Sequence, residues 1–170
     1  MVEIHQNMTM LAVLSDNHKY RYYYEKTWNK YRPCACVILL HPSLDDVLKS
    51  DKTVTSLTNY FIDQHYGKFI VVNLFAYMTS DSSELKKSEQ SYEQVNRSYF
   101  EKACAGSDMI FIGWGSDTKK FVSAKRAAEE ILVPYKSKLK CFVDDRGKFP
   151  RHPRDLNERL SIEEYHFFYI

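Results

Sequence analysis

The sequence predicts an α/β fold: a three-layer αβα domain with a mostly parallel central sheet of about four core strands, preceded by an N-terminal β-hairpin. The first observation behind this prediction is that short apolar runs alternate with segments of helical periodicity, which is the pattern of repeated βαβ units. The second is composition, because 44% of the 170 residues are hydrophobic and only 5 are glycine and 5 proline. Such a chain is long enough for one hydrophobic core and is neither disordered nor collagen-like.

We expect one domain over residues 1–170, in three successive parts. The N-terminal hairpin is expected within residues 1–28, the βαβ core over 34–143, and a His-Pro loop with a C-terminal tail over 144–170. No linker rich in serine or glycine and no internal repeat separates these parts.

The expected hairpin has an apolar first arm, residues 10–14, and a second arm rich in tyrosine, residues 20–25, with turn-forming residues between them. Tyr20, Tyr22 and Tyr24 alternate along the second arm, which predicts three rings on one face of a strand. These rings either pack as an aromatic ladder in the core or offer a surface on which bases stack.

The core strands are expected at four apolar runs. These runs are residues 34–40, 69–72, Met109–Ile112 and Leu139–Val143. Right-handed crossovers between parallel strands bring the carboxyl ends of the strands to one edge of the sheet, where ligands bind in folds of this kind. The residues that directly follow each run are therefore the candidate site.

Two helices are expected between the first three runs. Apolar residues recur on one face of residues 54–62, after Ser50 and Asp51, which are candidates to cap this helix. The second helix follows a Ser91-x-x-Gln94 capping box.

A third helix is expected from Phe121 to a stop before Pro134, with apolar residues on one side and an exposed face on the other. This helix lies in the basic part of the chain, because residues 119–159 carry a net charge of +6 whereas residues 1–118 carry −2. Lys125 belongs to this surplus, which fits a phosphate-bearing partner or an ordinary solvated helix face.

His41, Pro42 and Ser43 follow the first run, and Asp45 comes two residues later. Asp45, together with Asp46 and Asp51, is a candidate to bind a metal or to act as a general base, and the His41-Pro42-Ser43 segment is a candidate part of the site. The alternative is a turn with a capping serine and an aspartate that stabilises the helix dipole.

Asn73 follows the second run, with Phe75 and Tyr77 just after it, and Trp114 stands between two glycines after the third run. An amide at the end of a buried strand needs hydrogen-bond partners, and its donor and acceptor suit the edge of a nucleobase. Capping of the next loop would also satisfy Asn73. Plain packing would equally explain Trp114.

The fourth run leads to Pro150-Arg151-His152-Pro153, in which a histidine stands between two conformationally restricted prolines and beside a permanent cation. His152 is therefore a candidate to donate a proton or a hydrogen bond to developing negative charge. The candidates for contacts with a nucleic-acid backbone are Lys119, Lys120, Arg146, Lys148 and Arg154.

Several classes of site are excluded by the absence of their motifs. No glycine-rich nucleotide-binding loop and no metal-ligand spacing occurs, so we expect no cofactor and no metal. The four cysteines are expected to be free buried thiols: Cys34, Cys36, Cys104 and Cys141. The sequence has no apolar run long enough for a membrane span and no signal peptide, so we expect a cytoplasmic protein.

Taken together, the strand-end motifs resemble the uncharacterised bacterial and phage family known as domain of unknown function 1643. The residues that carry the resemblance are 20–28, His41-Pro42-Ser43, Asp51-Lys52-Thr53, Asn73-Leu74-Phe75, Trp114-Gly115 and Pro150-Arg151-His152-Pro153. His41 stands where this family usually has asparagine. Thr55 and Ser56 stand where it often has paired arginines.

A looser resemblance, in the order of the motifs, is to the uracil-DNA glycosylase superfamily, which also has a three-layer α/β fold. It implies that Asn73 hydrogen-bonds the base, that Phe75 or Tyr77 stacks on it, and that His152 supports the departing anion. The water-placing position falls at His41 and Asp45, neither of which matches the residues of that superfamily. Pro42, Ser43, Trp114 and Arg151 complete the expected substrate-binding set.

The leading hypothesis is thus an N-glycosidic hydrolase that acts on a nucleobase, in nucleic acid or a nucleotide. The alternatives are a non-catalytic binder of nucleic acid or nucleotide and a protein-interaction domain that uses the aromatic segment 165–170. We expect a nucleic-acid or nucleotide partner and no membrane. A homo-oligomer is compatible with the sequence, but nothing indicates one.

Overall fold

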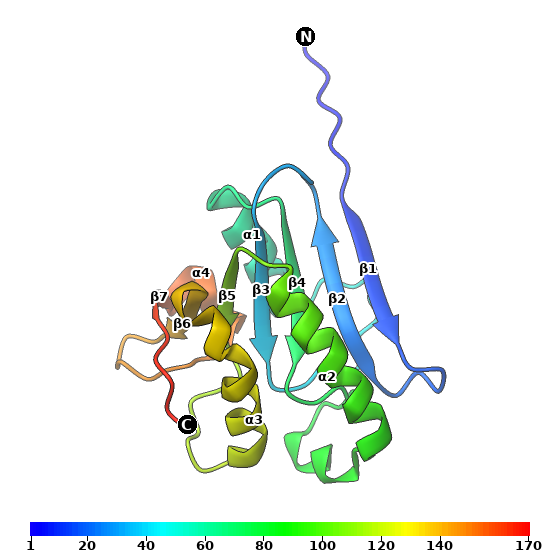
Figure 1. The fold of residues 1–170 in the computed structure, drawn as a ribbon. Coiled ribbons are helices and arrows are strands. Elements are labelled where there is room, and N and C mark those ends of the chain that lie inside the picture. Colours follow the sequence, from blue (N-terminus) through cyan, green and yellow to red (C-terminus); the bar gives the residue numbers. More distant parts are fainter.

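The computed structural model describes residues 1–170 and is built on a seven-stranded mixed sheet (Figure 1). The strand order is β1-β2-β4-β3-β5-β6-β7. The predicted α/β class is confirmed. The strands are β1 (Thr9–Leu14), β2 (Arg21–Thr27), β3 (Cys34–Leu39), β4 (Lys68–Asn73), β5 (Met109–Ile112), β6 (Leu139–Val143) and β7 (Ser161–Glu164).

The strands expected from the apolar runs pair in parallel, β3 with β4 and β5, and β5 with β6. The hairpin strands β1 and β2 are antiparallel, and β2 continues the sheet by pairing antiparallel to β4. At the other edge, β7 pairs antiparallel to β6. The sheet is therefore wider than the parallel core, because antiparallel strands extend it at both edges.

Helices connect and cover these strands, and α2 and α3 cross the front of the sheet in Figure 1. The α-helices are α1 (Lys52–Asp63), α2 (Gln90–Ala105), α3 (Val122–Leu132) and α4 (Leu156–Arg159). Three 3₁₀ segments lie at Ser82–Lys87, Val133–Lys138 and Pro153–Asp155. None of the helices combines the length and apolar character required to cross a membrane.

All six residues of β3 are buried, because successive side chains of a strand point to opposite faces and both faces of β3 are covered. Cys34, Cys36 and Ile38 pack in the cluster that includes residues of α2 and α3. The alternate residues pack in a second cluster with Leu57 and Phe61 of α1.

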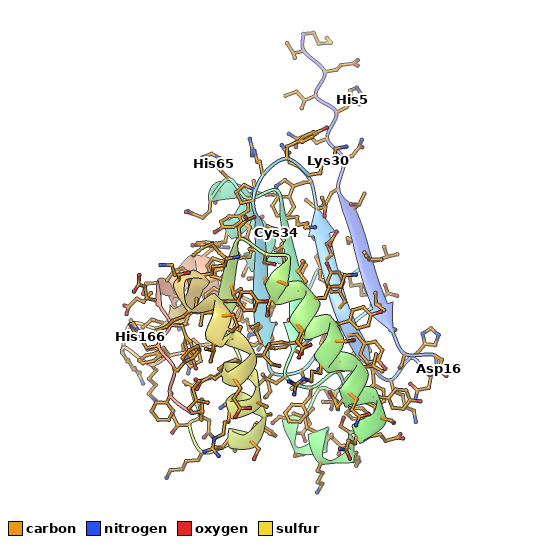
Figure 2. All side chains as sticks on the ribbon, viewed as in Figure 1. His5, Asp16, Lys30, Cys34, His65 and His166 are labelled. Atoms are coloured by element: carbon orange, nitrogen blue, oxygen red, sulfur yellow. The ribbon has the colours of Figure 1, made fainter.

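The prediction that the cysteines are free and buried is confirmed for all four of them. Figure 2 shows Cys34 among the packed side chains beside β3.

One predicted helix start is confirmed and the other is wrong. Asp51 caps α1, because its Oδ1 accepts a hydrogen bond of 2.8 Å from the Val54 N–H. The Ser91-x-x-Gln94 box does not cap α2, since this helix already begins at Gln90 and its N-cap makes no side-chain hydrogen bond. Glu93 instead accepts hydrogen bonds from the Ser88 hydroxyl and from the Ala76 N–H, the latter at 2.9 Å.

A β-bulge interrupts the hairpin at the start of β2. Val13 pairs with Tyr23 and Leu14 pairs with Arg21, so that Tyr22 has no partner on β1. An extra residue of this kind breaks the strict alternation of faces and redirects the side chains next to it.

The predicted face with three tyrosine rings is wrong because of this bulge. Tyr22 stacks on Tyr99 of α2, with ring centroids 5.6 Å apart, and Tyr23 also lies against Tyr99, at 6.3 Å. Tyr24 lies on the opposite face of the sheet, where its ring is 6.3 Å from that of Phe69. Tyr20, which stacks on Tyr92 of α2 with ring centroids 4.3 Å apart, and Tyr22 therefore share one face as predicted, and only Tyr24 lies on the face of α1.

The helical face predicted to be exposed on α3 carries a buried lysine. Lys125 is 1% exposed, its Nζ donates to the Asp117 carbonyl, and it lies 5.6 Å from the centroid of the Tyr169 ring. The desolvation of this ammonium lowers its pKa. Lys125 therefore does not belong to a solvated basic surface.

Glu129, one turn further along α3, is fully buried and holds the C-terminal segment. Its Oε1 accepts hydrogen bonds from the Tyr165 hydroxyl at 2.7 Å and the Phe168 N–H at 2.9 Å. Its Oε2 accepts from the N–H groups of Tyr169 and Ile170, at 2.7 and 3.1 Å. The backbone of segment 165–170 is thus held on α3, while the side chains of Phe168 and Ile170 remain exposed.

We predict that Glu129→Ala lowers the free energy of unfolding by about 3 kcal/mol, because it removes a buried acceptor on which four donors converge. The matched control is Glu130→Ala, at the neighbouring exposed position, which should cost less than about 0.5 kcal/mol. Urea denaturation of the two variants measures the difference. Equal stabilities would show that the carboxylate does not hold the segment.

Candidate functional site

A cleft of about 860 Å³ lies at the carboxyl ends of the parallel strands. Its walls come from the segments that follow β3, β4 and β5, from the loop after β6, and from the starts of α1 and β2. The predicted site residues that line it are His41, Pro42, Ser43, Asp45, Asn73, Trp114, Arg151, His152 and Arg154. The topology brings them together because parallel strands present their carboxyl ends at one edge.

Phe75 and Tyr77 do not line this cleft. After β4 the chain stays close to β3, since the N–H groups of Leu74 and Phe75 donate to carbonyls at the end of that strand. The Phe75 ring packs edge-on against Phe121, at 5.4 Å, and Tyr77 packs against Tyr20, also at 5.4 Å. Both rings therefore have protein partners outside the cleft.

Four of the predicted backbone contacts, Lys119, Lys120, Arg146 and Lys148, are exposed and lie outside the lining of the cleft. Each pair follows an aspartate whose carboxylate organises the turn. Asp117 Oδ1 accepts hydrogen bonds from the backbone N–H groups of the first pair, at 2.9 and 3.2 Å. Asp144 Oδ1 accepts from the backbone N–H groups of the second pair, at 3.0 and 2.9 Å. The Lys120 ammonium lies 3.9 Å from an Asp117 oxygen, whereas the charged groups of Lys119, Arg146 and Lys148 make no ion pair within the chain and could contact a partner larger than the cleft.

Asn73, the last residue of β4, is 3% exposed, and its Oδ1 has no hydrogen-bond partner. Its backbone is held from α2, because Asn96 Nδ2 donates to the Asn73 carbonyl at 3.0 Å. A buried acceptor without a partner is costly to leave unpaired. Since Asn73 lines the cleft, an N–H group of a ligand would satisfy it.

The wall after β5 is fixed by close packing. Adding a Cβ to Gly113 would place it 3.1 Å from Pro153 Cδ, so this glycine allows the His152 loop to pack against β5. Gly115 has a φ of 101°, a conformation that disfavours other residues. Trp114, between them, is 2% exposed, packs edge-on against Tyr165 at 5.7 Å, and has an unpartnered Nε1.

His152 is exposed at the edge of the cleft, where nearby protein atoms partly desolvate its ring. Desolvation lowers its pKa to about 4, and repulsion from the Arg154 guanidinium acts in the same direction. The carboxylate of Asp51 opposes this shift and His41 adds to it, so electrostatic coupling links the three residues. The imidazole is therefore neutral at pH 7.

His41 Nδ1 lies 3.1 Å from the carbonyl of Pro42. A carbonyl only accepts hydrogen bonds, so Nδ1 carries the proton in this contact and Nε2 remains available as an acceptor. Asp45 is exposed, and its carboxylate makes no hydrogen bond within the chain. These two groups are free acceptors on the β3 side of the cleft.

The sequence analysis missed a further residue of this cleft, Arg21. Regular alternation along the tyrosine-rich arm predicts that Arg21 faces the side of α2 together with Tyr23. The bulge places it on the side of Tyr24 instead, where its Cζ lies 6.0 Å from the ring centroid. Nothing in the sequence alone indicates the register shift.

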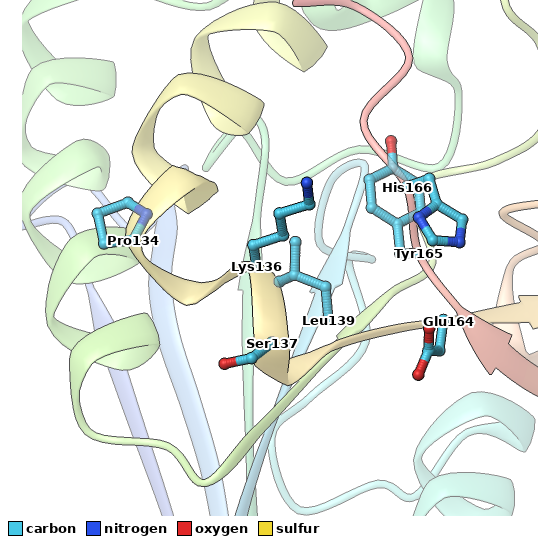
Figure 3. Close-up of a pocket in the computed structure, with 7 residues that line it drawn as sticks. All are labelled: Pro134, Lys136, Ser137, Leu139, Glu164, Tyr165 and His166. Atoms are coloured by element: carbon cyan, nitrogen blue, oxygen red, sulfur yellow. The ribbon is translucent and has the colours of Figure 1, made fainter.

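A second hollow, of about 470 Å³, lies at the amino end of β6 (Figure 3). Its lining includes Lys136, Glu164 and His166. It contains none of the predicted site residues and none of the buried polar atoms that lack partners. The cleft at the opposite end of the parallel strands is therefore the candidate functional site.

A family model with the description "Protein of unknown function (DUF1643)" matches residues 21–154, well over half of the chain. The match includes every residue that lines the cleft except Asp155. No curated protein and no solved structure matches the chain.

We predict that His152 titrates near pH 4 in an NMR titration, well below the value of about 6.5 for an unperturbed histidine. Arg154→Gln should raise this pKa, because it removes a like charge, whereas Arg97→Gln on the exposed face of α2 should not. A midpoint at or above 6.5 in the unmodified protein would contradict the proposed desolvation.

The same shift predicts a pH dependence of stability. Between pH 6.5 and about 4 the unfolded chain protonates His152 and the folded chain does not, so acidification through this window lowers the free energy of unfolding. His152→Gln should make this decrease smaller.

Proposed function

This chain belongs to the DUF1643 family of proteins of unknown function, and we propose that it is a glycosylase-like hydrolase of the N-glycosidic bond of a nucleobase, within nucleic acid or a nucleotide. The observation that carries the proposal is that Asn73 and His152 line one cleft together with His41, Asp45 and Trp114. They come from the end of β4 and from the segments that follow β3, β5 and β6. Their side chains suit base recognition, stabilisation of the leaving base and placement of the water molecule.

The proposal includes the finer architecture expected from the sequence. We take the fold to be a three-layer αβα domain that spans residues 1–170. The support is that α1 packs in the cluster on one face of the parallel strands, while α2 and α3 pack in the cluster on the other. In such a fold the strand-end cleft is the usual place for a ligand.

Asn73 would recognise the base. Its unpaired Oδ1 would accept a hydrogen bond from an N–H group of the base, and its Nδ2 would donate to an adjacent carbonyl of the base. This pair of groups suits a base edge that presents an N–H next to a C=O. Asn96 holds the Asn73 backbone, so the amide is presented from a rigid strand end.

His152 would stabilise the leaving base. When the glycosidic bond breaks, its electron pair stays on the base nitrogen, and water adds hydroxide to the sugar carbon and a proton to the base. With a pKa of about 4, the imidazole acts at pH 7 as a neutral hydrogen-bond donor to the developing anion. Arg151, also in the cleft wall, contributes positive charge.

The water molecule would be held by His41 Nε2 and the carboxylate of Asp45, which are free acceptors of the wall that follows β3. Asp51 is less suited to this role, because one of its oxygens caps α1.

We predict that the protein releases free base from oligonucleotides or nucleotides with altered bases, and that His152→Ala lowers the single-turnover rate by about 10²- to 10³-fold. Asn73→Asp should abolish selectivity between bases, because a carboxylate does not donate to the base carbonyl. Chromatography of the released base measures both effects, with Arg97→Gln as the folded control. Absence of release from DNA, RNA and nucleotides, with no effect of His152→Ala, would overturn the proposal.

The second candidate function is a binder of nucleic acid without turnover. It is favoured by the environment of the acceptors, since His41 bonds to the neighbouring Pro42 carbonyl and Asp45 is exposed, and no third group orients either of them as a base.

For this candidate we predict tight binding of a single-stranded oligonucleotide that weakens steeply with salt. Arg146→Gln should reduce the slope of log K against log salt concentration by about 0.7, because one phosphate contact is lost. Arg97→Gln, whose guanidinium already pairs with Glu101 at 2.9 Å, should leave the slope unchanged. Fluorescence anisotropy over a salt series tests this, and binding that is absent or independent of salt would exclude the candidate.

A further inference from the structure

Arg21 is the first residue of β2 and lines the cleft, and its charge has no partner within the chain. Its guanidinium makes no side-chain hydrogen bond and no ion pair within the chain, and its Cζ lies 6.0 Å from the centroid of the Tyr24 ring. Burial lowers its pKa, while the carboxylates of Asp51 and Asp45 act in the opposite direction. The charge is thus partly desolvated but unpaired, which is costly unless a ligand provides the partner.

A β-bulge at Tyr22 places the Arg21 side chain in the cleft. With regular alternation Arg21 would share a face with Tyr23, which lies against Tyr99 of α2. The bulge at Tyr22 turns Arg21 to the side of Tyr24 and of α1. Bulges that redirect one side chain are common beside functional sites.

Two other cations of the cleft are already engaged, whereas Lys49 and Arg154, which also line it, make no ion pair within the chain. Lys52 Nζ lies 2.5 Å from an Asp155 oxygen. Arg151 lies 3.5 Å from an Asp144 oxygen and donates to the Ser116 hydroxyl at 3.3 Å. Arg21 therefore retains all its donors for a ligand, and a guanidinium fork matches two oxygens of a phosphate.

Arg21 also lies beside the residue that we assign to the base. β2 pairs with β4, which ends at Asn73, and the Arg21 N–H donates to the carbonyl of Ala76 at 2.9 Å. A group bound by Arg21 is thus a neighbour of a group bound by Asn73. The hydroxyls of Ser43 and Thr53 lie in the same cleft, and neither is engaged in a hydrogen bond within the chain.

We propose that Arg21 is a phosphate-binding residue, which anchors the phosphate of the nucleotide whose base is held at Asn73. The position of the base rests on the proposed function, whereas the phosphate site rests on Arg21 alone. The phosphate belongs either to a free nucleotide or to a nucleic-acid backbone.

The experiment is a titration with inorganic phosphate at constant ionic strength, followed by the NMR signal of the arginine Nε–H groups. We expect one shifted side-chain signal that Arg21→Gln removes, with at least about tenfold weaker phosphate binding. Arg21→Lys should retain part of the affinity, because it keeps the charge and loses the fork. Arg97→Gln should bind as the unmodified protein does, and thermal melting verifies that each variant folds.

Two competitors distinguish the sources of the phosphate. Displacement of phosphate by uridine 5′-monophosphate but not by a single-stranded DNA 10-mer indicates a free nucleotide, and the reverse indicates a polymer. Equal phosphate binding by the folded Arg21→Gln variant, or no binding by the unmodified protein, would overturn the inference.

The outcome is separable from that of the proposed function. Asn73→Asp should leave inorganic phosphate binding intact while it alters base selectivity. Phosphate binding that depends on Arg21 without release of any base would contradict the hydrolase and support the phosphate site. Base release together with phosphate binding that does not depend on Arg21 would support the hydrolase and contradict the phosphate site.

Discussion

The arrangement of the molecule depends on one constraint, which is that β3 is hydrogen-bonded along both edges and buried on both faces. This strand pairs with a neighbour along each edge and packs its side chains on both faces. Polar chemistry is therefore excluded from the length of the core strands and is confined to the points where they end. The cleft follows from this exclusion, because the parallel strands end at the same edge and their loops carry the polar residues.

The buried carboxylate on α3 is fully hydrogen-bonded, but two buried polar groups of the cleft are not. Glu129 is fully buried, yet four donors from the C-terminal segment converge on it. Asn73 and Trp114 are as deeply placed, but each leaves one polar atom without a partner, at a cost of about 1–3 kcal/mol. Asn96 Oδ1 is also buried without a partner, and Asn96 does not line the cleft, so a ligand bound in the cleft would complete only Asn73 and Trp114.

The sequence predicted the parts of this fold that depend on local pattern. The apolar runs predicted the core strands to within a residue or two, and Asp51 was correctly predicted to cap α1. Each of these signals lies within a few residues of the element that it predicts. The strand-end residues of the cleft were predictable from topology. The failures involve partners far along the chain: Glu93 is bound by Ala76 rather than by a local cap, and Lys125 packs against Tyr169. Arg21 was missed because a one-residue register shift leaves no compositional trace.

The charges of the cleft divide the proposed ligand into two parts. A protonated His152 would attract phosphate to the place assigned to the base, and its competition with Arg21 would blur the orientation of the ligand. Desolvation and Arg154 keep this histidine neutral. The positive charge that attracts an anion then comes from arginines, which do not titrate near neutral pH. With His152 neutral, Arg21 therefore favours the orientation with the phosphate at Arg21 and the base between Asn73 and His152, and among the groups that shift the pKa of His152 the permanent competing charge is that of Arg154.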